Sequence, residues 1–439
     1  MSLRERLQTL LGEVGLGPGP STQKPQPATP KAGFHPSKLS GTDIPLQIGE
    51  RYESLEDLKG YRLEKTPHGS IPIFEHRIPS TEKVGIHRPS EWMTQSIQGL
   101  GQLLDDPRMD QFTIDQALFL DIEATDLNHG AGCTAFLLGL GFFEADGTFV
   151  IQQYLQRDPA DEMALLSLLV EKLNAYPFLV SYNGKSYDLS VLQNRLIVQR
   201  FFAIGEAALK LTPHVDLLHV GRRLWKELLP NCRLGTLEEH ILGEPRTGDL
   251  PGAMVPSYYF AYRNSTNAAY IKPVLEHNLI DVRSMVGLLT VVMERIIYPN
   301  RYAYAEELYE IGRWLYERGF RTKALSLLQR AVRLPMKAQA RAKAYRTTLR
   351  AYRQQGKSEA LLEVLEAYQE SFPEIAEPFI ELAKYHEHKT RDPDRALELA
   401  LKGRACVSSS DQATRDEIDH RIRRLQKRIA RRSAWSSMA

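Results

Sequence analysis

One nearly continuous apolar run in the middle of the chain constrains the fold more than any other feature. Residues 116–124 read Gln-Ala-Leu-Phe-Leu-Asp-Ile-Glu-Ala, and after the glutamine only Asp121 and Glu123 interrupt the run. Such a run predicts a central strand that is covered on both faces. Because alternate residues of a strand point to the same side, we expect Asp121 and Glu123 to share one face of the sheet.

The elements predicted around this run follow a definite order. Two more strands are expected at 134–143 and 148–155, joined by a hairpin turn at Asp146-Gly147. The periodicity then predicts a helix over 161–176, a strand at 178–182, a helix from about 189, a short strand at 214–218 and a closing helix over 273–296. Three antiparallel strands followed by strands alternating with helices resemble a ribonuclease H-like α/β fold with a mixed sheet.

Two further acidic segments follow the first. One runs from Asn183 to Asp188 with the sequence Asn-Gly-Lys-Ser-Tyr-Asp, and the other runs from His277 to Asp281. His277 and Asp281 are four residues apart in the closing helix, so they share a helix face. Carboxylates that lie against apolar elements must be paired or metal-bound, because an unpaired buried carboxylate would take up a proton. Hard carboxylate oxygens favour Mg²⁺ or Mn²⁺, and the predicted metal ligands are Asp121, Glu123, Asp188 and Asp281.

The three segments, in this order, resemble the motifs of the DEDD superfamily of 3′–5′ exonucleases. Residues from about 115 to 293 are more closely similar to the YprB-type bacterial ribonuclease H-like family, in blocks such as Ser181-Tyr-Asn-Gly-Lys-Ser-Tyr-Asp and Asp249-Leu-Pro-Gly-Ala. The resemblance implies a two-metal hydrolysis of phosphodiester bonds that releases nucleoside 5′-monophosphates. Two ions roughly 4 Å apart stabilise the attacking and leaving oxygens in such a reaction.

The resemblance also implies a role for each residue. Asp121 would bridge both metals, Glu123 and Asp281 would complete the first site, and Asp188 would hold the second metal directly or through water. His277 is the expected general base, since a neutral imidazole near pH 7 suits that role. It stands four residues before Asp281, one position off the place that the histidine branch usually uses. The predicted substrate contacts are Thr125, Asn183 and Lys185, although Asn183 equally suits a turn.

Three neighbouring residues have competing interpretations. Asp216 follows a short apolar strand, where a helix N-cap is favoured over a fifth metal ligand. Arg195 and Lys185 lie close enough in sequence to the second acidic segment to contact phosphates, but basic residues on helices are more often simply solvated.

Beyond residue 300 the chain is predicted to be wholly helical and internally repeated. Ala324, Ala360 and Ala396 recur at intervals of 36 residues, each followed by leucine. Small residues at a fixed period let paired helices pack closely, and the unit resembles a tetratricopeptide repeat. A last helix carries an apolar stripe at Ile418, Ile422, Leu425 and Ile429 among many arginines, which predicts a capping helix with an outward basic face.

These patterns divide the chain into four segments. Residues 1–45 are expected to form a disordered tail, dense in Pro, Gly, Ser and Thr in its later part, and residues 46–113 form a small segment without assigned chemistry. Residues 114–297 are the predicted ribonuclease H-like exonuclease domain. Residues 298–430 are the predicted tetratricopeptide-like repeats with their basic capping helix.

The composition limits the kinds of partner and the cellular compartment that we expect for this protein. The 56 Lys and Arg residues nearly balance the 54 Asp and Glu residues, so any nucleic-acid footprint must be local. The three cysteines (Cys133, Cys232 and Cys406) lie far apart, which suits a reducing compartment. The start of the chain lacks the apolar core of a signal peptide, and no stretch is long enough to span a bilayer. We therefore expect a cytoplasmic protein without membrane contact.

The leading hypothesis is a metal-dependent exonuclease that acts on an end of single-stranded DNA or RNA, with the repeats presenting a surface for a protein partner or for the substrate. One alternative is an interaction scaffold with an inactive nuclease-like domain. Another is a ribonuclease H-fold endonuclease that cuts structured nucleic acid with the same metals, and only the reaction products distinguish this enzyme from an exonuclease.

Overall fold

A computed structural model describes residues 54–126, 132–201, 209, 212–356 and 358–436. The tail predicted over residues 1–45 lies outside the described residues. The chain divides into two compact units, Met1–Ile297 and Tyr298–Ala439. Among the helices that the structure describes, none is both long enough and apolar enough to cross a membrane.

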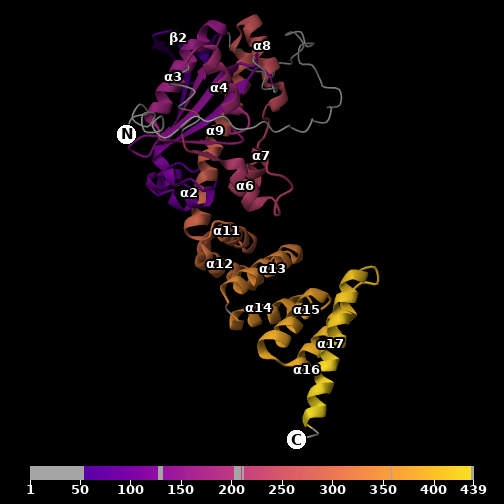
Figure 1. Ribbon diagram of the computed structural model, residues 1–439. Helices are drawn as coiled ribbons and strands as arrows, with labels where there is room; N and C mark the ends of the chain where they lie inside the picture. The colour runs from indigo at the N-terminus through magenta and orange to yellow at the C-terminus, as the bar shows by residue number, and fades with distance from the viewer. Residues whose placement is uncertain (1–53, 127–131, 202–208, 210–211, 357, 437–439) are drawn as a thin grey trace, which may run out of the picture. The chain divides into compact units, whose positions relative to one another are not determined.

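The described part of the first unit is built on one mixed sheet, which Figure 1 shows among its helices. Its seven strands lie in the order β1-β2-β5-β4-β3-β6-β7. The strands are β1 (Tyr61–Thr66), β2 (Gly69–Ile78), β3 (Ala117–Ala124), β4 (Ala135–Phe143), β5 (Phe149–Leu155), β6 (Phe178–Ser181) and β7 (His214–Asp216). Pairing is antiparallel from β1 through to β3 and parallel from β3 to β6 and β7. The predicted order of an RNase H-like sheet is thus confirmed from β3 onward.

The first two strands extend this sheet. Residues 46–113 had no predicted role, yet β2 pairs with β5, with Ile73 opposite Tyr154. Sequence periodicity could not reveal this join, because the two strands are far apart in the chain and their pairing is a long-range contact.

Helices and short turns of the first unit surround the sheet. The α-helices are α2 (Gln98–Leu104), α3 (Glu162–Ala175), α4 (Asp188–Val198), α6 (Leu217–Trp225), α7 (Leu234–Leu237), α8 (Val255–Ser265) and α9 (Ala268–Ile297). Single turns of 3₁₀-helix are η2 (Leu55–Asp57), η3 (Pro89–Glu91), η4 (Pro107–Gln111), η5 (Ile114–Gln116), η6 (Pro159–Asp161) and η8 (Gly252–Met254), and η7 (Glu238–Leu242) is a π-helical turn.

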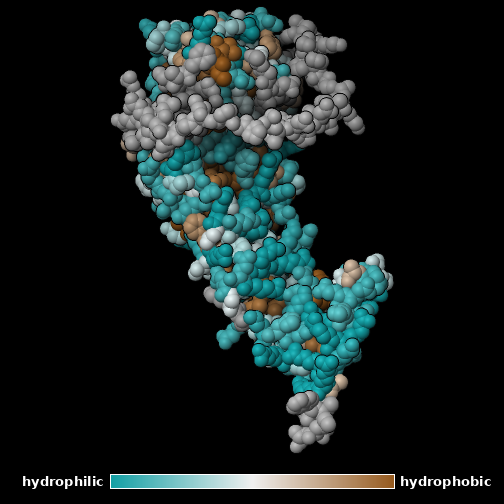
Figure 2. All heavy atoms as spheres, viewed as in Figure 1, coloured by the Kyte–Doolittle hydropathy of each residue, from teal (hydrophilic) through white to brown (hydrophobic). Residues whose placement is uncertain are grey.

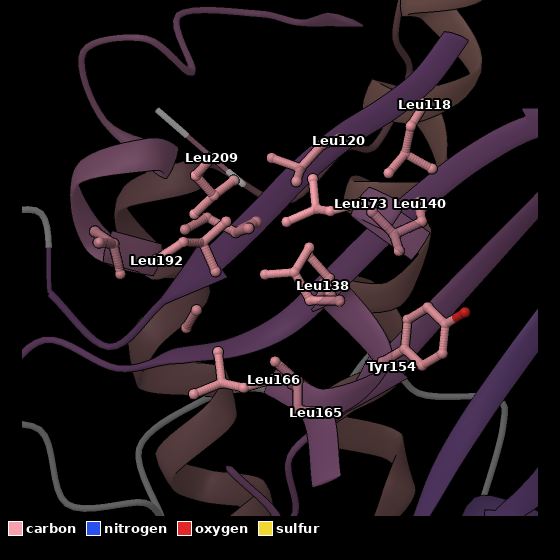
Figure 3. Packing of buried hydrophobic residues seen from close by; sticks show 14 of the residues in the cluster. Leu118, Leu120, Leu138, Leu140, Tyr154, Leu165, Leu166, Leu173, Leu192 and Leu209 are labelled. Atoms are coloured by element: carbon pink, nitrogen blue, oxygen red, sulfur yellow. The ribbon is translucent and has the colours of Figure 1, made fainter. Parts of the chain in front are cut away.

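The two faces of the sheet have separate apolar cores. On one face, leucines of β3 and β4 pack with those of α3 and α4, as Figure 3 shows for Leu118, Leu138 and Leu165. On the other face, residues of α8 and α9 pack with Phe74 and Phe136. Helix α9 contacts β3, β4 and β5, which makes it the element that covers the middle of the second face.

Two glycines of β4 let α9 approach the sheet closely. A Cβ atom at Gly139 would lie 2.2 Å from Oδ1 of Asn278, and one at Gly141 would lie 2.8 Å from Cγ1 of Val282. Both distances are shorter than a carbon atom tolerates. The missing side chains therefore create the space in which the middle of α9 meets the sheet.

The second unit is helical throughout its described residues (Figure 1). Its helices are α10 (Pro299–Tyr302), α11 (Ala305–Glu317), α12 (Arg321–Arg333), α13 (Ala338–Gln355), α14 (Ser358–Ser371), α15 (Ala376–Tyr385), α16 (Pro393–Cys406) and α17 (Gln412–Ser436), with the π-helical turn η9 (His386–Thr390). Successive helices from α11 to α17 pack against one another. The predicted helical region is confirmed, and its assignment to the tetratricopeptide class stays a prediction.

The packing of this unit follows its apolar positions. Ala324 and Ala396 are fully buried near the starts of α12 and α16, whereas Ala360 is half-buried in α14. On α17, Ile418, Ile422 and Leu425 are buried as the stripe predicted. The face of this unit seen in Figure 2 is mostly hydrophilic, in keeping with the many exposed charged residues of its helices.

Candidate active site

The central strand β3 separates apolar and acidic side chains by its alternation. Leu118, Leu120 and Ile122 belong to the core beneath α3 and α4. Asp121 and Glu123 alternate with them and therefore point to the opposite side, where α9 lies. The prediction that both carboxylates share one face is confirmed.

Helix α9 meets Asp121 through a buried asparagine. Nδ2 of Asn278 donates a hydrogen bond of 2.8 Å to Oδ2 of Asp121. Nε2 of Gln153, on β5, donates to Oδ1 of Asn278 at 2.8 Å and thereby fixes which way the amide points. Asn278 is fully buried and was missed as a site residue. A polar residue on the buried stripe of α9 is the signal that points to it, since buried amides need partners.

One turn of α9 presents His277 and Asp281 toward the same region. Nε2 of His277 lies 4.0 Å from Oε1 of Glu123 and 3.9 Å from Oδ2 of Asp281. The predicted shared face of His277 and Asp281 is confirmed. The other ring nitrogen, Nδ1, lies 2.8 Å from Oδ1 of Asp249, which comes from the loop after η7.

Asp188 begins α4 and is 4% exposed. Its Oδ2 has no hydrogen-bond partner among the described residues. Gly184, in the preceding turn, leaves room for it, because a Cβ there would lie 2.9 Å from this oxygen and 2.3 Å from Oγ of Ser181. A buried carboxylate oxygen without a donor is costly unless a cation neutralises it.

Asp121, Glu123, Asp188 and Asp281 are referred to below as the carboxylate cluster. Burial raises the pKa of Asp121, and repulsion from Asp281, Asp188 and Glu123 raises it further. Burial also raises the pKa of Glu123, of Asp188 and of Asp281, although Arg246 and His277 oppose the shift at Asp281. Three segments distant in sequence therefore place negative charges near enough to disfavour one another.

The donors of the carboxylate cluster fit a divalent cation. They are hard oxygens, they carry excess negative charge, and one buried oxygen of Asp188 lacks a partner. Among the described residues, no group of three or more His, Cys, Asp and Glu side chains already has the arrangement of a metal site. Asn278 and Arg246 bond to oxygens of Asp121 and Asp281, so a cation would have to replace or share these contacts.

Arg246 is a second residue that the sequence did not single out. Its guanidinium donates to Asp281, to Oδ2 of Asp249 at 2.7 Å and to Oε1 of Glu238 at 2.6 Å. These partners come from α9, the loop after η7 and η7 itself. No local periodicity signals such a contact, because it depends on how the loop folds back.

The predicted substrate contacts lie in the loops around the site. Oγ1 of Thr125 accepts a hydrogen bond of 3.0 Å from the backbone of Thr134, at the end of β3. Asn183 has a left-handed backbone with φ of 66°, which supports its role in the turn. Lys185 lines a hollow of about 430 Å³ beside η4 and His214. Substrate contact by any of the three stays a prediction.

Asp216 organises the turn that contains Asn183 and Lys185. Its carboxylate accepts from the backbone N–H of Asn183 at 2.9 Å and of Lys185 at 3.1 Å. It also accepts from Leu218 as the N-cap of α6, which confirms the predicted cap. By contrast, Arg195 forms a largely buried ion pair with Glu162, so this arginine is not presented for phosphate contact.

Comparison with known proteins agrees with this fold. Residues 118–293 match a family model of the RNase H superfamily, so the strands from β3 onward and the carboxylate cluster lie in an RNase H-superfamily domain. The chain is 32% identical over 321 residues to YprB of Bacillus subtilis (strain 168), described as an uncharacterized protein, and the match covers 71% of this chain and 75% of that protein. The chain therefore belongs to the YprB family, an RNase H-like nuclease family.

A solved structure is also similar at a distance. The family B DNA polymerase from the hyperthermophilic archaeon Pyrobaculum calidifontis has 16% identity and a TM-score of 0.32, over 47% of this chain and 29% of the polymerase. The match spans less than a third of that polymerase, and a likeness this weak supports no conclusion about the present chain.

Proposed function

We propose that this protein is a metal-dependent 3′–5′ exonuclease that hydrolyses DNA or RNA to nucleoside 5′-monophosphates. The carboxylate cluster carries the proposal, since three distant segments bring four acidic side chains together against apolar elements. This arrangement destabilises the protein unless cations bind, and the unpartnered Oδ2 of Asp188 lies buried in it.

The residues divide into ligands and a base. Asp121, Glu123, Asp188 and Asp281 would hold two divalent ions, either Mg²⁺ or Mn²⁺. Bound ions would supply charge to stabilise the attacking and leaving oxygens of an in-line displacement. Nε2 of His277 faces this region at 4.0 Å from Glu123, so it is the candidate to accept a proton from water.

Two partners go with this activity. The substrate is a single-stranded end of DNA or RNA, which enters near Thr125, Asn183 and Lys185. Because the net charge of the chain is nearly balanced, the phosphates of this substrate would be bound by a local group of basic residues. The second unit, proposed to consist of tetratricopeptide-like repeats, offers a surface for a protein partner.

The test is hydrolysis of single-stranded DNA and RNA, labelled at either the 5′ or the 3′ end, by the full chain with Mg²⁺ or Mn²⁺. Asp121→Asn keeps the size of the side chain but removes its charge. Replacing a residue that only hydrogen-bonds to a metal ligand typically lowers activity by about 10–100-fold. Since Asp121 is a proposed ligand itself, we expect Asp121→Asn to lower the hydrolysis rate by roughly 100-fold or more. Asp146→Asn, in an exposed hairpin turn, is the matched control and should retain full activity.

The products decide among the alternatives. Mononucleotides released from the 3′ end support the proposal. Internal fragments from a branched or hybrid substrate would instead identify an endonuclease. If no substrate is cut and calorimetry detects no divalent-ion binding, the domain serves as a scaffold.

A further inference from the structure

Glu244 anchors the loop that follows η7 to two neighbouring parts of the first unit. Glu244 forms an ion pair with Arg283 of α9, with 3.2 Å between its Oε1 and Nη2 of the arginine. The same carboxylate accepts a hydrogen bond of 2.7 Å from the backbone of Gly85. Because these contacts tie the loop to α9 and to residue 85, the rest of the loop up to Asp249 is held in place beside His277.

Asp249 is held at both of its oxygens. Oδ1 lies 2.8 Å from Nδ1 of His277. Oδ2 accepts a bond of 2.7 Å from Nη1 of Arg246 and lies 3.0 Å from the same Nδ1. Arg246 also donates a hydrogen bond to Glu238, which is 1% exposed. With one oxygen bound to the guanidinium, the carboxylate cannot rotate away from the imidazole without breaking a charged hydrogen bond.

This contact determines the tautomer of the neutral His277 ring. An ionised carboxylate only accepts hydrogen bonds, and here Arg246 holds Asp249 as an acceptor. The proton of the neutral ring therefore sits on Nδ1. Nε2 then carries the lone pair, and this atom lies 4.0 Å from Glu123 and 3.9 Å from Asp281.

We propose that Asp249 and Arg246 are positioning residues that fix His277 with its proton on Nδ1, so that Nε2 can accept a proton from the attacking water. The inference rests on the proposed nuclease function and assigns a purpose to two residues outside the carboxylate cluster. Arg246 acts on both sides of the ring, because its guanidinium also donates to Asp281.

The proposed hydrolysis transfers one proton to His277 and exchanges one bond at phosphorus. Water gives one proton to Nε2 of His277, and its oxygen bonds to phosphorus while the bond from phosphorus to the 3′ oxygen breaks. The imidazolium then passes its proton to the released 3′ oxygen or to solvent. Asp249 stays ionised and stabilises the imidazolium through Nδ1–H.

Asp249→Asn tests the proposal through the tautomer itself. Arg246 donates toward position 249, so the asparagine turns its oxygen to Arg246 and its NH₂ group to Nδ1 of His277. Because the NH₂ group then takes the nearer position, 2.8 Å from Nδ1, we expect Nδ1 to accept and the ring proton to move to Nε2. ¹⁵N spectra of metal-free protein with labelled histidine, recorded for the neutral ring, would report this reversal. Comparison with a His277→Gln variant identifies the signal.

Activity and a second substitution sharpen the test. We expect Asp249→Asn to lower the rate by roughly 100-fold, because Nε2 no longer offers a lone pair. Adding Arg246→Gln supplies a carbonyl for the asparagine NH₂ group, so the Nδ1–H tautomer and part of the activity should return. Glu276→Gln, on an exposed side chain next to His277 in the sequence, is the matched control and should change neither.

Each outcome is decisive in one direction. A wild-type His277 with its proton on Nε2 would overturn the proposal without any variant, as would an unchanged tautomer in Asp249→Asn. A reversed tautomer in Asp249→Asn together with the predicted rescue supports it. If wild-type protein cuts no nucleic acid but its tautomers behave as expected, the nuclease proposal fails while the positioning of His277 stands.

Discussion

At the scale of single residues, the carboxylate cluster makes the metal-free protein sensitive to pH. The pKa of each member is raised above the ordinary value of about 4. The folded state therefore binds more protons than the unfolded state, and the free energy of unfolding must fall as pH rises above about 4. The contribution of these four carboxyl groups to the free energy of unfolding is complete only at a pH below their ordinary pKa of about 4.

Urea unfolding in the presence of a chelator measures this slope. We expect the free energy of unfolding to decrease between pH 5 and pH 7, and Asp188→Asn to flatten the decrease because it removes one buried charge. The variant should also be the more stable protein at pH 7 without metal. Equal slopes for the two proteins would contradict the assigned repulsion.

At the scale of elements, the packing of α9 on β4 decides where the site residues meet. Gly139→Ala would place a methyl group 2.2 Å from Oδ1 of Asn278. Overpacking of this kind costs about 1–3 kcal/mol, and the displaced Asn278 would lose its bond to Asp121. We therefore expect both lower stability in urea unfolding and lower nuclease activity.

A control for Gly139→Ala is available in the same unit. A Cβ at Gly252 would meet nothing within 4 Å, so Gly252→Ala should leave the free energy of unfolding and the activity nearly unchanged. If Gly139→Ala behaves like Gly252→Ala, the close approach of α9 to β4 is not needed for the site.

At the scale of the whole molecule, the division at Ile297 predicts separate responses to metal. The carboxylate cluster lies in the first unit, so divalent ions should raise only one of two calorimetric unfolding transitions. A ligand at 100 times its Kd stabilises the unit that binds it by about 2.7 kcal/mol. Asp188→Asn should abolish or reduce that shift.

A substitution in the second unit identifies the other transition. Leu425 is fully buried on α17, and Leu425→Ala should lower the second transition alone, since such truncations cost about 2–5 kcal/mol. A single transition that both metal and Leu425→Ala displace would show that the two units unfold together.

Much of the fold was predictable because it repeats over short distances. The strands at 116–124, 134–143 and 148–155 and the closing helix all appear close to their predicted positions. So do the facing pairs Asp121 with Glu123 and His277 with Asp281, because a side-chain period of two in strands and 3.6 in helices is a local property.

The remaining contacts could not be predicted from the sequence, because they join residues that are far apart in the chain. Asn278 bonds to Asp121 across 157 positions of sequence, and Asp249 reaches His277 from a loop without periodicity. The addition of β1 and β2 to the sheet is equally long-range. The sequence by itself determined which residues are acidic and which way each faces within its own element. Only the tertiary structure decided that the carboxylates share one region and that Asp249, bonded to Arg246, contacts His277, because these contacts depend on how whole elements pack.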